Sequence, residues 1–256
     1  GKTFGSAGES VVIEEFMEGE EASVLCFTDG NTIVPMISAQ DHKRISDGDM
    51  GANTGGMGAY APAPVMTKEL DKIVYDTILL PAVKAMKKEG CPFKGCLYAG
   101  LMITKDGPQV VEFNCRFGDP ETEAILPLLE SDLAKIMLAC TKGTLKKERV
   151  EWKNACAVDI VLASEGYPAT HSSGEEIVGL EEAKKTGCLV FHAGSMKKKG
   201  RYFVNGGRVL NVAAVAPTLK EARDKAYEGV SKISWRGMQY RHDIADKGLT
   251  RLKKRK

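Results

Sequence analysis

The chain has 256 residues, of which 43% are hydrophobic and 27% are charged, a balance that is ordinary for a globular protein. The 36 basic and 34 acidic residues leave a formal net charge of +2, which excludes a chain that binds nucleic acid through its overall charge. No apolar run is long enough to cross a membrane. We therefore expect neither nucleic acid nor a membrane among the partners.

Seven cysteines are scattered along the chain, and no two of them form a Cys-x-x-Cys pair. The odd count and the length of the chain favour reduced thiols, so we expect a cytoplasmic protein. The chain begins at Gly1 without an initiator Met, and we expect it to be a piece of a longer protein. The basic end, Arg251–Lys256, is expected to be a frayed, solvated tail.

The first part of the chain is expected to be β-rich. Strands are predicted over residues 10–16, 22–28 and 32–36. The run Asp29–Asn31 is a hairpin signal between the second and third of them. Residues 40–64 are rich in Gly, Asp, Asn and Pro, which predicts an irregular loop, and a loop of that length is typical of a functional segment.

The middle of the chain is expected to be mainly helical, around one strand pair. An amphipathic helix is predicted over residues 67–89, with Pro81 as a kink and Gly90 as its end. The strand pair is expected over 96–103 and 108–114. Asp119 followed by Pro120 is typical of a helix start, and this helix is expected to reach about Thr141.

A domain boundary is predicted near residues 145–152, which divides the chain into 1–148 and 149–256. Beyond it, strands alternate with one short and one longer helix. The strands are expected at 155–163, 190–193, 202–204 and 208–215, and the helices at 180–186 and 218–233, the latter opened by a Thr218-x-x-Glu221 capping box. This pattern predicts a compact α+β unit.

The run Val111–Glu121 is the most informative part of the sequence. Glu112, Asn114 and Arg116 are spaced two apart after a predicted strand, so they are expected to point to one face. A carboxylate and an amide oxygen suit magnesium, and a guanidinium suits phosphate. This spacing indicates a magnesium–nucleotide site. A solvated ion pair beside an Asn turn explains the same residues, so the alternative stays open at this point.

Three other segments carry candidate chemistry. Gln40–Arg44 packs an acid, an imidazole and two cations together, and the glycines of Gly51–Tyr60 let backbone N–H groups approach an anion. Both suit a phosphate-bearing ligand, although a flexible surface loop has the same composition.

The acidic run Glu14–Glu21 fits a ribose and an adenine edge, or an exposed acidic turn. Asp119 and Glu121 suit an amine, whereas His192 and Arg208 are expected to shape turns.

Six of these segments occur in one order: Glu14-Glu15-Phe16, Gln40–Arg44, Asn53–Tyr60, Glu112–Glu121, His192-Ala193-Gly194 and Gly206–Leu210. Up to about Ile244, the chain strongly resembles the phosphoribosylamine–glycine ligases (glycinamide ribonucleotide synthetases) of purine synthesis, in the animal, trifunctional form. The resemblance implies an α+β fold with a partial ATP-grasp core over 1–148. A small α+β C-terminal domain with a basic tail would follow over 149–256.

The resemblance also implies the site residues. Adenine and ribose would contact Glu14, Glu15, Phe16, Met17 and Glu21, while Asn53, Gly55 and Gly56 would contact phosphates and the substrate side of ATP. Glu112 and Asn114 would hold Mg²⁺ or Mn²⁺. Arg116 would face the transferring phosphate, with Asp41 and Lys43 as further catalytic residues.

The reaction implied by the resemblance joins glycine to 5-phosphoribosylamine through glycyl phosphate, gives glycinamide ribonucleotide, and splits ATP to ADP and phosphate. An amino-terminal domain is missing from this chain, and the animal form implies fused aminoimidazole ribonucleotide synthetase and transformylase domains. We expect the chain alone to bind ATP weakly and turn over poorly. Two alternatives are a catalytically inactive nucleotide-binding or assembly module and a carboxylase-type ATP-grasp enzyme.

Overall fold

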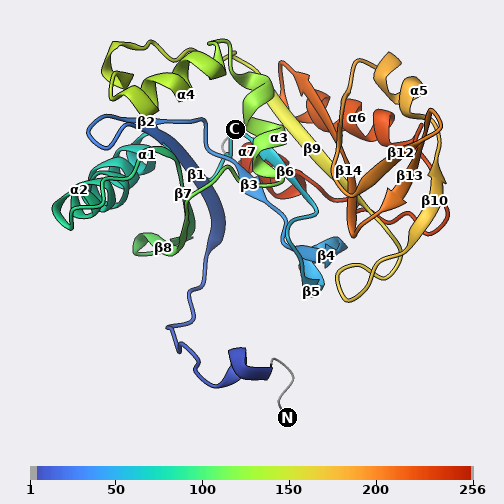
Figure 1. Cartoon of the computed structure of the whole chain (residues 1–256), viewed down its shortest axis with the longest axis horizontal. Coiled ribbons are helices and arrows are strands. Elements are labelled where there is room, and N and C mark those ends of the chain that lie inside the picture. The colour runs from blue at the N-terminus through green and yellow to red at the C-terminus, as the bar shows by residue number, and fades with distance from the viewer. Residues whose placement is uncertain (1–4, 255–256) are drawn as a thin grey trace.

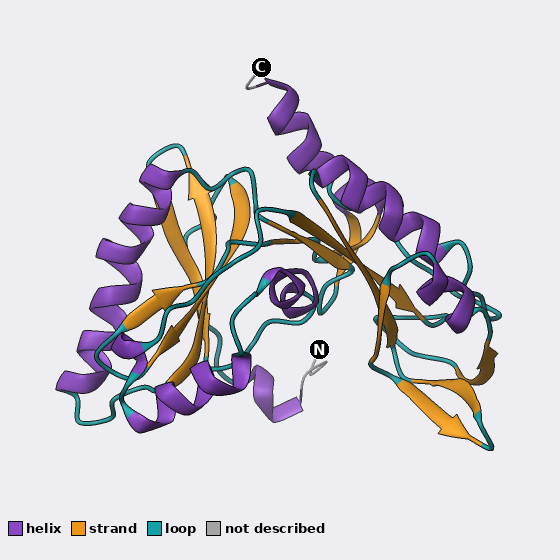
Figure 2. Cartoon of the chain, turned by 90° about the horizontal axis from the view of Figure 1, so that it is seen from above, coloured by secondary structure: helices purple, strands orange, loops and turns teal. Residues whose placement is uncertain are grey.

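The computed structural model describes residues 5–254 and contains two main antiparallel sheets (Figure 1). The first has the order β2-β1-β7-β8. Its strands are β1 (Glu20–Thr28), β2 (Ile33–Pro35), β7 (Gly95–Thr104) and β8 (Gly107–Asn114). The hairpin predicted at Asp29–Asn31 and the strand pair predicted around residues 105–107 are confirmed. Viewed from above, the two main sheets lie in separate halves of the molecule, with helices on their outer sides (Figure 2).

Strand β1 of the first sheet is buried on both faces, and its side chains alternate between two cores. Val24 and Cys26 of β1 pack under α1 (Lys68–Val74) and α2 (Leu80–Lys88). Leu25 and Phe27 face the opposite core. That core also receives side chains from α3 (Glu121–Ile125), α4 (Leu133–Lys142) and the second sheet. It therefore joins the two halves of the molecule through apolar contact.

The second sheet has the order β11-β14-β9-β6-β3. Its strands are β3 (Gln40–Asp41), β6 (Gly58–Ala61), β9 (Cys156–Ala163), β11 (Leu189–His192) and β14 (Arg208–Ala216). β6 pairs with β9, so one sheet combines strands from both sides of residue 148. Helix α6 (Leu219–Val230) packs on one face of this sheet through Ala222 and Ala226, and Thr218 and Glu221 form the predicted capping box.

The remaining elements are short. A three-stranded sheet contains β10 (Ser173–Ile177), β13 (Arg201–Asn205) and β12 (Ser195–Lys198), and α5 (Leu180–Lys185) follows β10. β4 (Arg44–Ser46) and β5 (Met50–Asn53) form a two-stranded ribbon. Short 3-10 turns lie at Gly5–Gly8, Asp47–Asp49, Leu126–Leu128 and Leu145–Lys147. Within residues 5–254, no helix combines the length and apolar character that a membrane crossing requires.

The strand predicted at residues 10–16 is wrong. Figure 1 shows this segment as part of an extended arm that leads away from the body of the molecule, and Ile13 is 91% exposed. A β-branched composition favours an extended backbone, but a strand also requires a neighbour for its hydrogen bonds. No strand among residues 5–254 pairs with this segment. The irregular loop predicted at 40–64 is also wrong, because β3, β4, β5 and β6 lie within it.

The helix predicted from Asp119 to Thr141 is wrong in two respects. Pro120, not Asp119, occupies the N-cap of α3, and it makes no side-chain cap. The carboxylate of Asp119 instead accepts a hydrogen bond from Arg208. The helix also breaks after Leu128, and Asp132 caps α4 as a separate helix. By contrast, the helix predicted over 67–89 is confirmed, with a π-helical turn, Tyr75–Leu79, shortly before Pro81.

The frayed tail predicted at the C-terminus is wrong for the residues that the structure describes. Helix α7 (Asp246–Lys254) continues to Lys254, and Arg255 and Lys256 lie outside the described residues. Arg251 forms an ion pair with Glu20 at the start of β1. Gly248 allows α7 to approach Tyr60 closely, since a Cβ there would lie 2.8 Å from the Tyr60 ring. The basic residues of this segment therefore belong to a docked helix.

Candidate active site

Strand β8 brings two of the predicted ligands together at the edge of the first sheet. Glu112 and Asn114 are two residues apart on this strand, so they share a face. The Asn114 amide nitrogen donates a hydrogen bond of 3.0 Å to Glu112 Oε1, which leaves the Asn114 carbonyl oxygen free of that bond. Glu112 has room because its strand neighbour is Gly100, which carries no side chain.

These two residues line a pocket of about 230 Å³. Arg116 follows the end of β8, donates to the backbone oxygen of Phe117 at 3.0 Å and lines the same pocket. The residues that complete the lining are Asp41, Lys43, Thr54, Gly55, Tyr98, Asp119 and Glu121. The structure therefore gathers all three predicted catalytic residues, both predicted metal ligands and Gly55 around one cavity.

Asp41 and Lys43 enter this pocket from β3 and the residues after it. Lys43 Nζ lies 3.4 Å from Glu21 Oε2, which places Glu21 beside the pocket too. Burial alone would lower the pKa of Lys43, but the carboxylates of Glu21 and Asp41 outweigh burial and raise it above its ordinary value. Burial, followed by repulsion from Glu121, raises the pKa of Asp41 well above its ordinary value. The pocket thus combines a cationic amine with a carboxyl that resists ionisation.

Glu121 forms the floor of the pocket and is almost fully buried. The hydroxyls of Ser23 and Tyr98 donate to the same carboxylate oxygen, at 2.9 and 2.8 Å. Burial and the charge of Glu121 in turn raise the pKa of Tyr98, so its hydroxyl stays a donor. The sequence associated Glu121 with an amine, but it gave no sign of Tyr98. The alternation of β7, which sets Tyr98 opposite Asn114, is the signal that identifies it.

The glycine-rich loop forms another wall, although its amides are already used. Thr54 N–H donates to Lys43, Gly55 N–H to the Tyr167 hydroxyl and Gly56 N–H to the Thr54 hydroxyl. A Cβ on Gly56 would lie 2.8 Å from Asp41 Oδ1, so this glycine lets the loop pass close to the acid. Asn53 is exposed, pairs with Arg44 across β4 and β5, and does not line the pocket.

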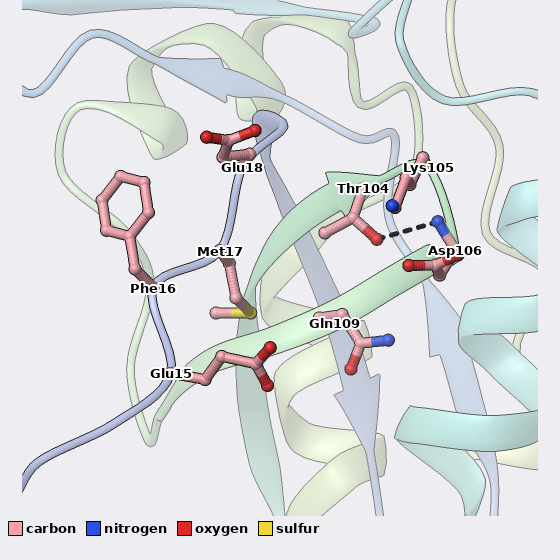
Figure 3. Close-up of a pocket in the computed structure, with 8 residues that line it drawn as sticks. All are labelled: Glu15, Phe16, Met17, Glu18, Thr104, Lys105, Asp106 and Gln109. Atoms are coloured by element: carbon pink, nitrogen blue, oxygen red, sulfur yellow. Dashed lines mark hydrogen bonds between the residues drawn. The ribbon is translucent and has the colours of Figure 1, made fainter.

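The predicted adenine residues lie at a second pocket of about 460 Å³, between the extended arm and the turn that joins β7 to β8 (Figure 3). It is lined by Glu15, Phe16, Met17, Glu18, Thr104, Lys105, Asp106 and Gln109. In Figure 3 the Phe16 ring points away from the turn residues, and 87% of Phe16 is exposed. Glu14 is exposed and does not line this pocket.

The donor chemistry of Glu112 and Asn114 fits a magnesium ion. Among residues 5–254, no group of three or more His, Cys, Asp or Glu side chains is placed to hold a metal by itself. Mg²⁺ commonly takes only one or two protein oxygens and completes its shell with water and substrate phosphates. One carboxylate beside one amide oxygen, with Arg116 and Lys43 close by, matches that pattern.

A second group of buried acids lies behind the pocket, between α3 and the second sheet. Asp159 on β9 is fully buried, and neither of its carboxylate oxygens has a hydrogen-bond partner among the described residues. Burial, then repulsion from Glu123 and Asp119, raises the pKa of Asp159 well above its ordinary value. Burial and Asp119 also raise the pKa of Glu123 to about 7. These carboxyls are therefore expected to hold protons that the unfolded chain releases.

This difference predicts that alkali weakens the fold. Because the pKa values of these carboxyls are raised in the folded protein, their contribution to stability is fully present at low pH. It is lost as pH rises from about 4, where carboxyls of the unfolded chain ionise, through about 7 and above. Asp159→Asn replaces the ionisable carboxyl with an amide that needs no proton uptake on folding, and it is expected to raise the free energy of unfolding at pH 8 by about 1–3 kcal/mol. Urea unfolding at pH 4.5, near the start of this window, and at pH 8 measures it.

The matched control is Asp106→Asn in the exposed β7–β8 turn, which should leave the pH dependence of unfolding unchanged. An Asp159→Asn variant that is destabilised equally at both pH values would contradict the assignment of a protonated Asp159 in the native state.

Comparison with known proteins agrees with this geometry. Residues 1–122 match the family model "Phosphoribosylglycinamide synthetase, ATP-grasp (A) domain", and residues 157–247 match the C domain of the same synthetase. The trifunctional purine biosynthetic protein adenosine-3 of Gallus gallus is 54% identical over 98% of this chain and 25% of its own length. A phosphoribosylamine–glycine ligase of Vibrio vulnificus is 48% identical over 98% of this chain and 59% of its own length.

Solved structures agree with the sequence comparisons. The crystal structure of a phosphoribosylamine–glycine ligase from Thermotoga maritima has a TM-score of 0.80 and 39% identity, over 91% of this chain and 57% of that one. The biotin carboxylase domain of a thermophilic 2-oxoglutarate carboxylase is similar in fold alone, with a TM-score of 0.61 and 16% identity over 88% of this chain and 49% of that one. The chain thus spans between a quarter and three fifths of the length of the curated relatives compared above. With an α+β, ATP-grasp fold and matches to both domain models, it belongs to the phosphoribosylglycinamide synthetase family.

Proposed function

We propose that the protein containing this chain is an ATP-dependent carbon–nitrogen ligase that joins glycine to 5-phosphoribosylamine in purine synthesis. Family membership supports this proposal, as does one observation above all: Glu112, Asn114, Arg116, Lys43 and Asp41 line a single pocket. The gathered cations suit a phosphoryl group, and the carboxyls suit an amine. The seven cysteines form no disulfide, which agrees with a cytosolic location.

The chemistry needs two displacements. A glycine carboxylate oxygen attacks the γ-phosphorus of ATP, and the bond from that phosphorus to the bridging oxygen of ADP breaks. The amine nitrogen of phosphoribosylamine then attacks the acyl carbon of glycyl phosphate. Phosphate leaves with the bonding electrons, and the amine loses a proton. Phosphorylation is needed because a free carboxylate has no good leaving group.

Each residue of the pocket has a role in this scheme. Glu112 and Asn114 would hold Mg²⁺, which when bound would neutralise charge on the phosphates. Arg116 would face the transferring phosphoryl group, and Lys43 would lie beside it. The buried carboxylate of Glu121 would hold the glycine ammonium, with the Asp41 carboxyl beside it. Burial and the neighbouring Glu121 raise the pKa of Asp41 well above its ordinary value, so this carboxyl is suited to hold a proton beside the reacting groups.

The nucleotide base would occupy the second pocket. Glu15 and Met17 line it, whereas Glu21 lies beside the first pocket through its contact with Lys43. The two pockets are placed along the β7–β8 hairpin, one at its turn and the other where β8 ends. That separation suits a molecule whose base and terminal phosphate are apart.

The test is formation of ADP by the full-length protein, with Mg²⁺, ATP, glycine and phosphoribosylamine. ADP release that depends on both glycine and phosphoribosylamine is the expected result. Binding of ATP without any glycine-dependent ADP would contradict the proposal and favour the inactive nucleotide-binding module. Activity with bicarbonate in place of glycine would instead indicate a carboxylase-type enzyme.

A further inference from the structure

Two residues of the C-terminal region contact the glycine-rich loop of the pocket. Arg208 begins β14, and Tyr167 follows β9, so both lie in the part that matches the C domain. The Tyr167 hydroxyl accepts a hydrogen bond of 3.0 Å from Gly55 N–H. Arg208 Nη1 donates to the Gly55 backbone oxygen at 3.0 Å. Both backbone groups of Gly55 are therefore bound by residues from two distant segments of the chain.

Arg208 also holds the opposite wall of the pocket. The same Nη1 donates to the Asp119 backbone oxygen at 2.8 Å and to Asp119 Oδ1 at 2.9 Å. Asp119 lies two residues before Glu121, so this contact holds the turn that places Glu121 in the pocket. A Cβ on Gly55 would lie 3.0 Å from the guanidinium carbon, so a glycine here lets Arg208 approach the loop closely.

Tyr167 and Arg208 are themselves held in place by their neighbours. Gln239 Nε2 donates to the backbone oxygen of Tyr167 at 3.1 Å, and the Tyr167 ring lies so close to Gly207 that a Cβ there would be 2.4 Å from it. The backbone oxygen of Arg208 accepts from Gly194 N–H at 2.8 Å. A rigid support of this kind preserves a geometry that a mobile loop would lose.

From these contacts we infer that Arg208 and Tyr167 are positioning residues, which set the Thr54–Gly56 wall against the Asp119–Glu121 wall. This role rests on the proposed function, because it concerns the part of the pocket that would hold the glycine substrate. The nucleotide pocket lies at the β7–β8 turn and contacts neither residue. Loosening Arg208 or Tyr167 should therefore affect glycine far more than ATP.

Hydrogen exchange tests the positioning without any need for turnover. In the full-length protein, Tyr167→Phe removes the acceptor of Gly55 N–H and keeps the ring. Exchange of the residue 53–58 amides is expected to become about three- to tenfold faster. Tyr202→Phe is the matched control, since Tyr202 lies on β13 and packs against His192. Unchanged exchange in Tyr167→Phe would overturn the inference.

Kinetics of Tyr167→Phe and Arg208→Lys test the consequence for the site. Arg208→Lys keeps the positive charge but lacks the planar guanidinium, so we expect it not to preserve the contacts to Gly55 and Asp119. We expect kcat/KM for glycine to fall at least about tenfold and KM for ATP to change less than about twofold. Arg201→Lys, on the surface pair with Glu176, is the control. An equal effect on ATP and glycine would overturn the inference, whereas an inactive wild-type protein would count only against the proposed ligase activity.

Discussion

Replacing Glu112 with Ala, or Asn114 with Leu, is expected to lower Mg²⁺-dependent turnover of the full-length protein by about 10²- to 10³-fold. Each change removes one of the two proposed oxygen ligands, and charge stabilisation on a transferring phosphate is commonly worth that much. The fold should be nearly unaffected, because the two side chains bond to each other at a partly exposed strand edge. Initial rates at saturating ATP and several Mg²⁺ concentrations measure the effect.

Glu148→Ala is the control for this prediction, because it removes an exposed carboxylate outside both pockets. Binding of Mn²⁺ in the presence of ADP provides a second measurement, and it should weaken in the Glu112 and Asn114 variants only. Near-normal turnover in either variant, or unchanged Mn²⁺ binding, would show that the metal lies elsewhere.

The largest effect on stability is expected from Arg241→Met. Arg241 is 1% exposed and donates to both oxygens of Asp243, to Asp49 Oδ1 and to the backbone oxygen of Arg44. Through these bonds it ties the segment before α7 to the β4–β5 ribbon. Methionine fills similar space but leaves Asp243 without its cation and Asp49 with Lys247 alone. We expect the free energy of unfolding to fall by about 3 kcal/mol, as measured by urea unfolding.

The same ion pairs predict how acid acts on the wild-type protein. Burial would raise the pKa of Asp243, but the hydrogen bonds from Arg241 outweigh it and hold that pKa well below its ordinary value. Lys247 and Arg241 likewise lower the pKa of Asp49. A lowered pKa stabilises the fold above about pH 4, where unfolded carboxylates are ionised, and the stabilisation is lost as pH falls through the native pKa.

Arg241→Met should therefore be less sensitive to acid than the wild type below about pH 4. Arg236→Met, at a strongly exposed arginine, is the control and should change stability by less than about 0.5 kcal/mol. Loss of less than about 1 kcal/mol in Arg241→Met would contradict the importance given to this cluster.

Local patterns in the sequence predicted the elements that local chemistry determines. The Thr218–Glu221 capping box, the Asp29–Asn31 hairpin and the β7–β8 pair are each set by residues close in sequence. The shared pocket of Glu112, Asn114 and Arg116 follows from the same kind of rule. Strand alternation places Glu112 and Asn114 on one face of β8, and Arg116 lies only two residues beyond the end of that strand. Their roles in binding metal and phosphate remain proposals.

Errors arose where distant residues decide the outcome. Asp119 is a good N-cap by type, but Arg208 engages its carboxylate from another part of the chain. Residues 10–16 have the composition of a strand and no partner strand among the described residues. Arg208 itself was expected to shape a turn, and only the folded structure brings it to the pocket. No local sequence pattern predicts which distant strand or side chain will contact a given residue in the folded chain.

The pairing of β6 with β9 has a consequence for synthesis on the ribosome. Gly58–Ala61 emerges first, but its hydrogen-bonding neighbour is made about a hundred residues later. Throughout that interval β6 can pair only with β3, and its other edge lacks its partner strand. The second sheet therefore cannot reach its native strand order until β9 has left the ribosome.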